Sequence, residues 1–221
     1  DNFLIDIPYP VVFKPNIDSY GGRGIQFPSN IQELKKIMKN KSNYVIQEKI
    51  VPSPFFEKYN QYGLNTIRVN LYRSVKTNKI CYLHSALRMG RKGKLDNVTS
   101  GGIQCYIDNQ GFLNDYAVDI FGSKYQVHPD SKIKFSKEEK IPLFEEMKKT
   151  AINIAEELYL ARLISLDICL DINSKWRVIE INLHDITTEF SQYAGEPFFG
   201  PYTKEVIDYC ISHPWWRGRI M

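Results

Sequence analysis

Asp167, Glu180 and Asn182 are spaced so that they could bind one metal ion together. They belong to two runs, residues 163–172 and 176–182, in which polar and apolar side chains alternate as in β-strands. If the apolar set faces a core, the carboxylates face the opposite side. Two carboxylates and an amide oxygen are hard ligands that suit Mg²⁺ held with phosphate oxygens and water. The alternative is a solvated sheet face with scattered acids.

The turn between these two strands determines which side chains face each other. If Ser174 and Lys175 form a two-residue turn, the register puts Asp167 opposite Asn182, with Glu180 one pair away on the same face. Opposed side chains lie about 5 Å apart at Cβ, so the three would converge. A slip of one residue would bury the acids, which favours the metal interpretation.

A glycine-rich segment near the start of the chain could bind phosphate. It lies between two strand-like runs, with Lys14 at the end of the first, and comprises Gly21, Gly22, Arg23 and Gly24. The spacing is not that of a P-loop, and no helix follows directly. Backbone N–H groups of such a turn could still fold over a phosphate chain, and Lys14 could add a charge. The alternative is a plain hairpin turn beside a solvated lysine.

A third candidate ends the strand-like run at residues 43–51. It consists of Gln47, Glu48, Lys49 and Ile50, and two prolines follow it. Clefts form at such junctions between subdomains, and backbone groups there could bind the edge of a purine. The alternative is an ordinary strand with polar residues at its exposed end.

Two arginines, Arg68 and Arg88, interrupt otherwise apolar strands in the middle of the chain. An arginine in such a place either pairs with a carboxylate or is positioned for an anion. The sequence leaves both possibilities open for each residue.

The elements that must position these residues fall into two parts. Residues 1–51 predict a small sheet of three strands covered by one helix at 28–41, and the prolines after it mark a boundary. Residues 52–221 predict an antiparallel sheet with a long helix at 141–161, whose first turn would hold Pro142. The last predicted helix spans 200–213. We therefore expect an α+β fold with two subdomains.

Composition limits the classes of function. The 221 residues are 43% hydrophobic, which is ordinary for a globular protein, and a net charge of +4 is too mild to indicate nucleic-acid binding. No apolar run approaches the roughly 20 residues of a membrane span. The four cysteines form no CxxC pair, so we expect neither a disulfide framework nor a zinc site, and a cytoplasmic location.

Taken in order, these features resemble the ATP-grasp superfamily over nearly the whole chain. In detail the sequence most resembles the branch associated with sugar transfer, through the stretches LNTIR, ALRMGRKGKLDNVTSGGI, VHPDSKIKF and IPLFEEM. The resemblance implies an α+β ATP-grasp fold, with nucleotide in the cleft between two subdomains made of antiparallel sheets and packed helices. The domain that usually precedes the glycine loop would be largely absent.

The resemblance also implies roles for the candidate residues. Lys14 would contact the ATP phosphates, residues 21–24 would form a lid over them, and residues 47–50 would receive adenine. Asp167, Glu180 and Asn182 would hold one or two Mg²⁺ ions. Arg88 would lie near the transferred phosphoryl group, and Arg68 near the phosphates or in the acceptor pocket, which Thr99 to Gly102 would help to line.

The implied activity is an ATP- and Mg²⁺-dependent ligase that phosphorylates a carboxylate and passes the acyl group to an amine or similar nucleophile. The branch suggests a role in cell-surface polysaccharide synthesis, with a small molecule or saccharide as acceptor. A phosphotransferase of the same fold and a nucleotide-binding module without catalysis stay open. The sequence names neither the acceptor nor the oligomeric state.

Overall fold

The computed structural model describes residues 7–16, 24–39, 42–61, 63–91, 101–184 and 186–214. The chain divides into two compact units, Asp1–Val51 and Pro52–Met221. None of the helices within the described ranges has the length and apolar character that crossing a bilayer requires.

The first unit is a two-stranded antiparallel sheet with one helix. Its elements are β1 (Val11–Pro15), α1 (Ile31–Met38) and β2 (Tyr44–Glu48). Val11, Phe13 and Leu34 are fully buried or nearly so, and they form its small core. Only two of the three predicted strands form, because residues 24–27, the strand-like run that follows the glycine-rich segment, make only a single bridge, from Gln26 to Phe13.

Reciprocal capping explains where α1 begins. Asn30 Oδ1 accepts a hydrogen bond from the Glu33 backbone N–H at 2.9 Å, and Glu33 Oε2 accepts one from the Ser29 N–H at 2.8 Å. Two N–H groups that the helix cannot pair internally are thereby satisfied. The helix is accordingly shorter than the predicted 28–41.

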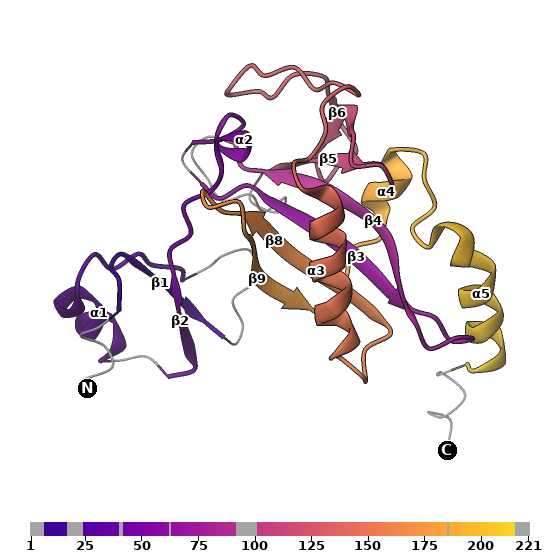
Figure 1. Cartoon of the computed structure of the whole chain (residues 1–221), viewed down its shortest axis with the longest axis horizontal. Helices are drawn as coiled ribbons and strands as arrows, with labels where there is room; N and C mark the ends of the chain where they lie inside the picture. Colours follow the sequence, from indigo (N-terminus) through magenta and orange to yellow (C-terminus); the bar gives the residue numbers. More distant parts are fainter. Residues whose placement is uncertain are drawn as a thin grey trace. The chain divides into compact units, whose positions relative to one another are not determined.

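The second unit contains a seven-stranded antiparallel sheet in the order β7-β6-β5-β4-β3-β8-β9 (Figure 1). The strands are β3 (Thr66–Arg73), β4 (Ile80–Met89), β5 (Ile103–Ile107), β6 (Leu113–Val118), β7 (Lys124–Tyr125), β8 (Leu163–Leu170) and β9 (Trp176–Asn182). The helical elements are α2 (Pro54–Glu57), α3 (Phe144–Glu156), α4 (Glu189–Tyr193), the 3₁₀ turn η4 (Gly200–Tyr202) and α5 (Thr203–Ser212). This arrangement confirms the expected α+β class with antiparallel sheets and packed helices.

Helix α3 lies across one face of this sheet, as Figure 1 shows. Its buried residues Phe144, Met147 and Ala151 recur at helical spacing, which agrees with the long helix predicted in this region. The start of the helix differs from the prediction, because Leu143 precedes it in the left-handed region at φ 51°. Pro142 therefore lies before the helix and not in its first turn.

Strand alternation gives the sheet two different faces. On β3, Ile67, Val69 and Leu71 are fully buried in the core that includes α3. Arg68 and Asn70, between them, face the opposite side. The sheet therefore has an apolar face under α3 and a polar face on the other side.

Candidate functional site

One row of side chains crosses the polar face of the seven-stranded sheet. The strand register aligns Tyr106 on β5, Ala86 on β4, Arg68 on β3, Asp167 on β8 and Glu180 on β9. Neighbours in such a row lie about 5 Å apart at Cβ. Arg68 and Asp167, which are 99 positions apart in the sequence, are thereby brought to one strip of the sheet.

Asp167 is the buried centre of this row. Its Oδ1 accepts from Arg68 Nε at 2.8 Å, and its Oδ2 accepts from Arg68 Nη2 and Arg88 Nη1, both at 2.7 Å. Burial opposes the charge on Asp167, but attraction and hydrogen bonds from Arg88 and Arg68 outweigh it and hold the pKa of the carboxyl below its usual value. Both arginines are therefore paired, one of the two possibilities that the sequence left open.

The register of the β8–β9 hairpin differs from the prediction. Asp167 lies opposite Glu180, and Asn182 lies opposite Ser165. The two-residue turn is wrong because Asp171 Oδ1 accepts from the N–H groups of Asn173 and Lys175, both at 2.9 Å, which forms a wider turn.

A shift in register then returns the acids to one face. It occurs between the pairs Asp167–Glu180 and Ile168–Val178, so that Ile179 is the extra residue of a bulge. Without it, Asp167 would face Ile179. Asp167, Glu180 and Asn182 consequently lie close together, although through different pairings from those predicted.

The three residues fit a magnesium ion that takes most of its ligands from phosphate and water. Glu180 is exposed and Asn182 is half-buried at the edge strand. The Asp167 carboxylate has about four lone-pair positions. Three of them accept hydrogen bonds from the two arginines, and one remains. Across the described parts of the chain, no group of three or more His, Cys, Asp or Glu side chains could hold a metal ion. A cation here would thus depend on two carboxylates and an amide.

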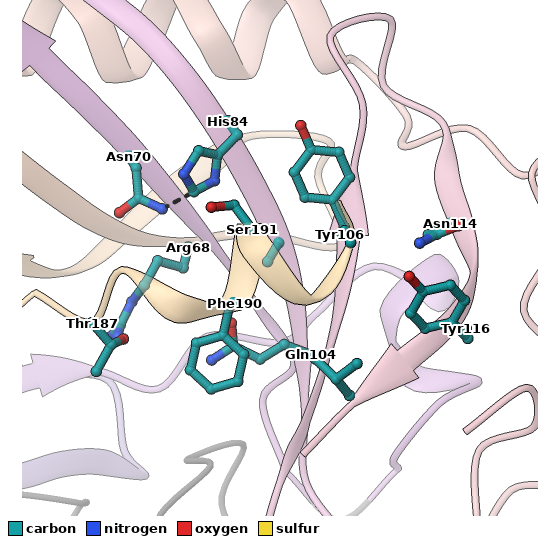
Figure 2. Close-up of a pocket in the computed structure, with 13 residues that line it drawn as sticks. Arg68, Asn70, His84, Gln104, Tyr106, Asn114, Tyr116, Thr187, Phe190 and Ser191 are labelled. Carbon is teal, nitrogen blue, oxygen red and sulfur yellow. Dashed lines mark hydrogen bonds between the residues drawn. The ribbon is translucent and has the colours of Figure 1, made fainter. Parts of the chain in front are cut away.

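A small pocket lies on the same face (Figure 2). Its floor comes from β3 to β6, and α4 with the segment before it forms a wall. The polar residues that line it are Arg68, Asn70, His84, Gln104, Tyr106, Asn114, Tyr116, Thr187 and Ser191. The apolar ones are Ala86, Val118, Phe190 and Ala194.

Four buried polar atoms of the pocket residues have no hydrogen-bond partner in the described structure. They are Asn70 Oδ1, His84 Nε2, Gln104 Nε2 and Ser191 Oγ. The four residues are only 1 to 5% exposed. Buried polar groups are normally paired, because each unpaired one costs about 1–3 kcal/mol. Buried water commonly pairs with polar groups that are concentrated around one small cavity in this way.

His84 is an uncharged imidazole in this pocket. Its Nδ1 lies 3.4 Å from Asn70 Nδ2, and Figure 2 shows the two side chains side by side. Burial lowers the pKa of His84 to about 4, so the ring is neutral at pH 7.

In the first unit, the structure places Lys14 and Gln47 on the same face of the small sheet. Lys14 pairs with Val45 and Gln47 with Val12, on the side away from the buried Val11 and Phe13. Glu48 ends β2, and Lys49 and Ile50 follow it.

Gly24 has φ 78°, and a Cβ there would lie 3.0 Å from the Pro15 ring, so glycine is required. Gly21, Gly22 and Arg23 lie outside the described residues, as do Thr99 and Ser100.

The sequence prediction missed Asn70, His84 and Gln104. Each interrupts an apolar strand at an alternate position, as Arg68 and Arg88 do, and that shared pattern was the available signal.

The comparisons with known proteins identify the family. A model of the family described as "Sugar-transfer associated ATP-grasp" matches residues 1–206. This chain belongs to the sugar-transfer associated ATP-grasp family. No curated protein matches its sequence.

Solved structures share the ATP-grasp fold with this family member. An N5-carboxyaminoimidazole synthetase from Staphylococcus aureus has a TM-score of 0.52 at 12% identity, covering 90% of this chain and 41% of that one. The same enzyme complexed with ADP has a TM-score of 0.54 at 13% identity, with the same coverage. This ATP-grasp chain thus spans about two fifths of the length of those structures.

A third structure is the biotin carboxylase domain of Hydrogenobacter thermophilus 2-oxoglutarate carboxylase, in complex with MgADP, ADP and bicarbonate. Its TM-score is 0.51 at 14% identity, covering 85% of this chain and 34% of that one. Such low identities show a shared fold and nothing finer.

Proposed function

We propose that this ATP-grasp chain is an ATP- and Mg²⁺-dependent ligase. It would phosphorylate a carboxylate and join the acyl group to an amine or a similar nucleophile, in the synthesis of a cell-surface polysaccharide or its precursor. The observation that carries the proposal is the row from Glu180 through Asp167 to Arg68, which ends at a pocket lined mostly by polar side chains. Family membership adds the expectation of ATP as the phosphoryl donor.

In the second unit, each residue of the row has a distinct proposed task. Glu180 and Asn182, with the remaining lone pair of Asp167, would hold Mg²⁺. When bound, the ion would offset the negative charge that develops on the transferred phosphoryl group. Arg68 and Arg88 would attract the carboxylate and the transferred phosphoryl group. Asp167 keeps the two guanidinium groups in place, because it bonds both.

The proposed reaction has two balanced steps. A carboxylate oxygen attacks the γ-phosphorus of ATP, the bond to the bridging oxygen breaks, and ADP leaves. The nucleophile then attacks the acyl carbon of the acyl phosphate, and inorganic phosphate leaves while the amine loses its proton. Exclusion of water is needed between the steps, because an acyl phosphate hydrolyses.

In the first unit, Lys14 and residues 21–24 are proposed to bind the ATP phosphates, and residues 47–50 to receive adenine. The shared face of Lys14 and Gln47 supports one binding surface on that sheet. Lys14→Ala should raise the Kd for ATP by about 10-fold or more, since a charged hydrogen bond is lost. Titration calorimetry measures this, with Lys35→Ala on exposed α1 as the control.

Turnover by the full chain tests the reaction class. With ATP, Mg²⁺, a carboxylic acid and hydroxylamine, a ligase releases ADP and phosphate and yields a hydroxamate. A stable phosphorylated product without hydroxamate would identify a phosphotransferase instead. ATP binding with no turnover of any acid would indicate a binding module and overturn the proposal.

Glu180→Gln tests the metal-binding part of the site. Turnover should fall by at least about 100-fold, because an amide replaces a charged Mg²⁺ ligand. The fold should be intact, since Glu180 is exposed. Glu138→Gln, also at an exposed position, is the matched control. Wild-type turnover in Glu180→Gln would show that the metal assignment is wrong.

A further inference from the structure

Helix α5 leaves most of its apolar side chains uncovered by the described parts of the chain. None of its residues is buried, whereas α3 buries four. Ile207 is 52% exposed and Ile211 is 70% exposed. Apolar surface that is exposed over several neighbouring residues commonly marks a place of contact with another segment or molecule.

An open groove with about 190 Å³ of free space lies between α5 and the seven-stranded sheet. Tyr72 and Leu163, which are paired on β3 and β8, line it from the sheet. Val206, Tyr209 and Cys210 line it from α5. An apolar cavity of about 150 Å³ takes up benzene, so this groove has room for an aromatic ring.

The polar groups beside the groove already have partners. Tyr72 Oη donates a hydrogen bond to Glu205 Oε1 at 3.0 Å, and Arg162 Nη1 donates one to the Ser74 carbonyl oxygen at 3.3 Å. The groove therefore offers mainly ring faces and aliphatic carbons. An apolar or aromatic group suits it, whereas an ion would lose its hydration there without gaining a partner.

Glu205 fixes the start of α5 on the sheet. Its Oε1 accepts hydrogen bonds from Ser74 Oγ at 2.7 Å and from the Val75 backbone N–H at 3.0 Å. A shift of α5 that closed the groove would break these bonds. A group from another segment is therefore the better occupant.

The residues that follow α5 include two tryptophans at a suitable distance. The last described range ends at residue 214, and Trp215 and Trp216 come next in the sequence. His213 stacks on Tyr209 with ring centroids 4.3 Å apart, so His213 lies on the side of α5 that lines the groove. From there, three residues span up to about 10 Å, roughly the length of two helical turns. Either indole can thus reach back along α5.

We propose that residues 215–216 fold back over α5 and that one of their two indole rings fills the groove. An indole buries a large apolar surface, and the Arg162 guanidinium can lie against its face. The ring also contacts Phe199, another residue that lines the groove. This contact holds α5 and the segment before it on the same face of the sheet as Arg68.

Thiol labelling of the full chain tests the proposal, because Cys210 lines the groove. With Trp215→Ala and Trp216→Ala combined, Cys210 should react with N-ethylmaleimide about 5-fold faster or more, since only the undocked form, about one fifth of the molecules or less, exposes the thiol in wild type. Mass spectrometry of peptides assigns the label, with Cys81 as the internal reference. Phe121→Ala, which removes a ring that is 87% exposed elsewhere, is the matched control and should leave the rate unchanged.

Filling the groove from within shows whether it is the binding site. Val206→Phe places a ring there from α5, so the two tryptophan substitutions added to it should no longer change the rate at Cys210. Val75→Phe, from the turn after β3, replaces it if a thermal unfolding scan shows that Val206→Phe does not fold.

Three results would overturn the proposal. One is equal labelling of Cys210 with and without the two tryptophans, and another is an effect of the tryptophans that persists in the filled groove. The third is protection by a different occupant. Protection that increases with protein concentration over a ~100-fold range would assign the rings to a second copy of the chain. Protection that needs added phosphatidylglycerol vesicles would assign them to a lipid surface.

Discussion

The two faces of the seven-stranded sheet bury their residues for different reasons. Under α3, Ile67, Val69 and Leu71 are fully buried in the hydrophobic core, and their apolar side chains need no hydrogen-bond partners. On the other face, Asn70 and His84 are almost as buried, at 5% and 4% exposed, yet each has a polar atom without a described partner. Burial on the first face stabilises the fold, whereas burial on the second costs stability.

This difference teaches where to look for function in the sheet. A polar residue that lowers stability in the middle of a strand is expected to serve function and not folding. The Arg68–Asp167–Arg88 cluster adds to the same face, because ion pairs taken out of water contribute little net stability over apolar packing. The predictions that follow test whether the two faces differ in this way.

Removal of the central carboxylate should have the largest effect. Asp167→Ala removes the buried carboxylate that pairs with both Arg68 and Arg88, and Arg88 is itself only 4% exposed. We expect the free energy of unfolding to fall by about 3–5 kcal/mol in urea titrations. Glu180→Ala, next in the same row but exposed, should change it by no more than about 0.5 kcal/mol. A loss under about 1 kcal/mol for Asp167→Ala would mean that the cluster is not desolvated.

Acidification should weaken the polar face through His84. Burial holds its pKa at about 4, below the ordinary 6.5, so between these pH values the unfolded chain takes up a proton that the folded chain does not. Stability is therefore full above pH 6.5 and falls as the pH drops toward 4, by roughly 3 kcal/mol in total from this residue.

The matched measurement is urea unfolding of wild type and His84→Gln at several pH values. The stability of the variant should fall less steeply over this window, because the titrating group is gone while His128 and the carboxylates are unchanged. Parallel curves for the two proteins would show that His84 is not buried in its neutral form.

Much of the sheet was predictable because alternation marks both faces. The runs around Arg68, Arg88 and Asp167 gave β3, β4 and β8 within a few residues. The pairing of Asp167 with Glu180 was not predictable in detail, because the turn at Asp171 and the bulge at Ile179 leave no trace in an alternating pattern. The wider turn and the bulge each shift the register, and together they keep Asp167 and Glu180 on the predicted face.

The pocket was beyond sequence reasoning for a different reason. His84 and Gln104 meet only through the pairing of β3, β4 and β5, and α4 is five residues long, too short for a periodic signal. Whether a buried amide is satisfied depends on atoms contributed by other strands. The roles of Lys14 and of residues 47–50 stay predictions, which ATP titrations would test.

The smallest expected change is a gain in stability when one unpaired polar side chain on the polar face becomes apolar. Gln104→Leu replaces a buried amide that has an unpaired Nε2 with an apolar side chain of similar size. The protein should become more stable by up to about 1 kcal/mol in urea, because a desolvated donor is removed. Gln110→Leu at the exposed turn should change stability little. If Gln104→Leu is instead destabilised by more than about 1 kcal/mol, the amide serves the fold, and the polar face is structural at that position.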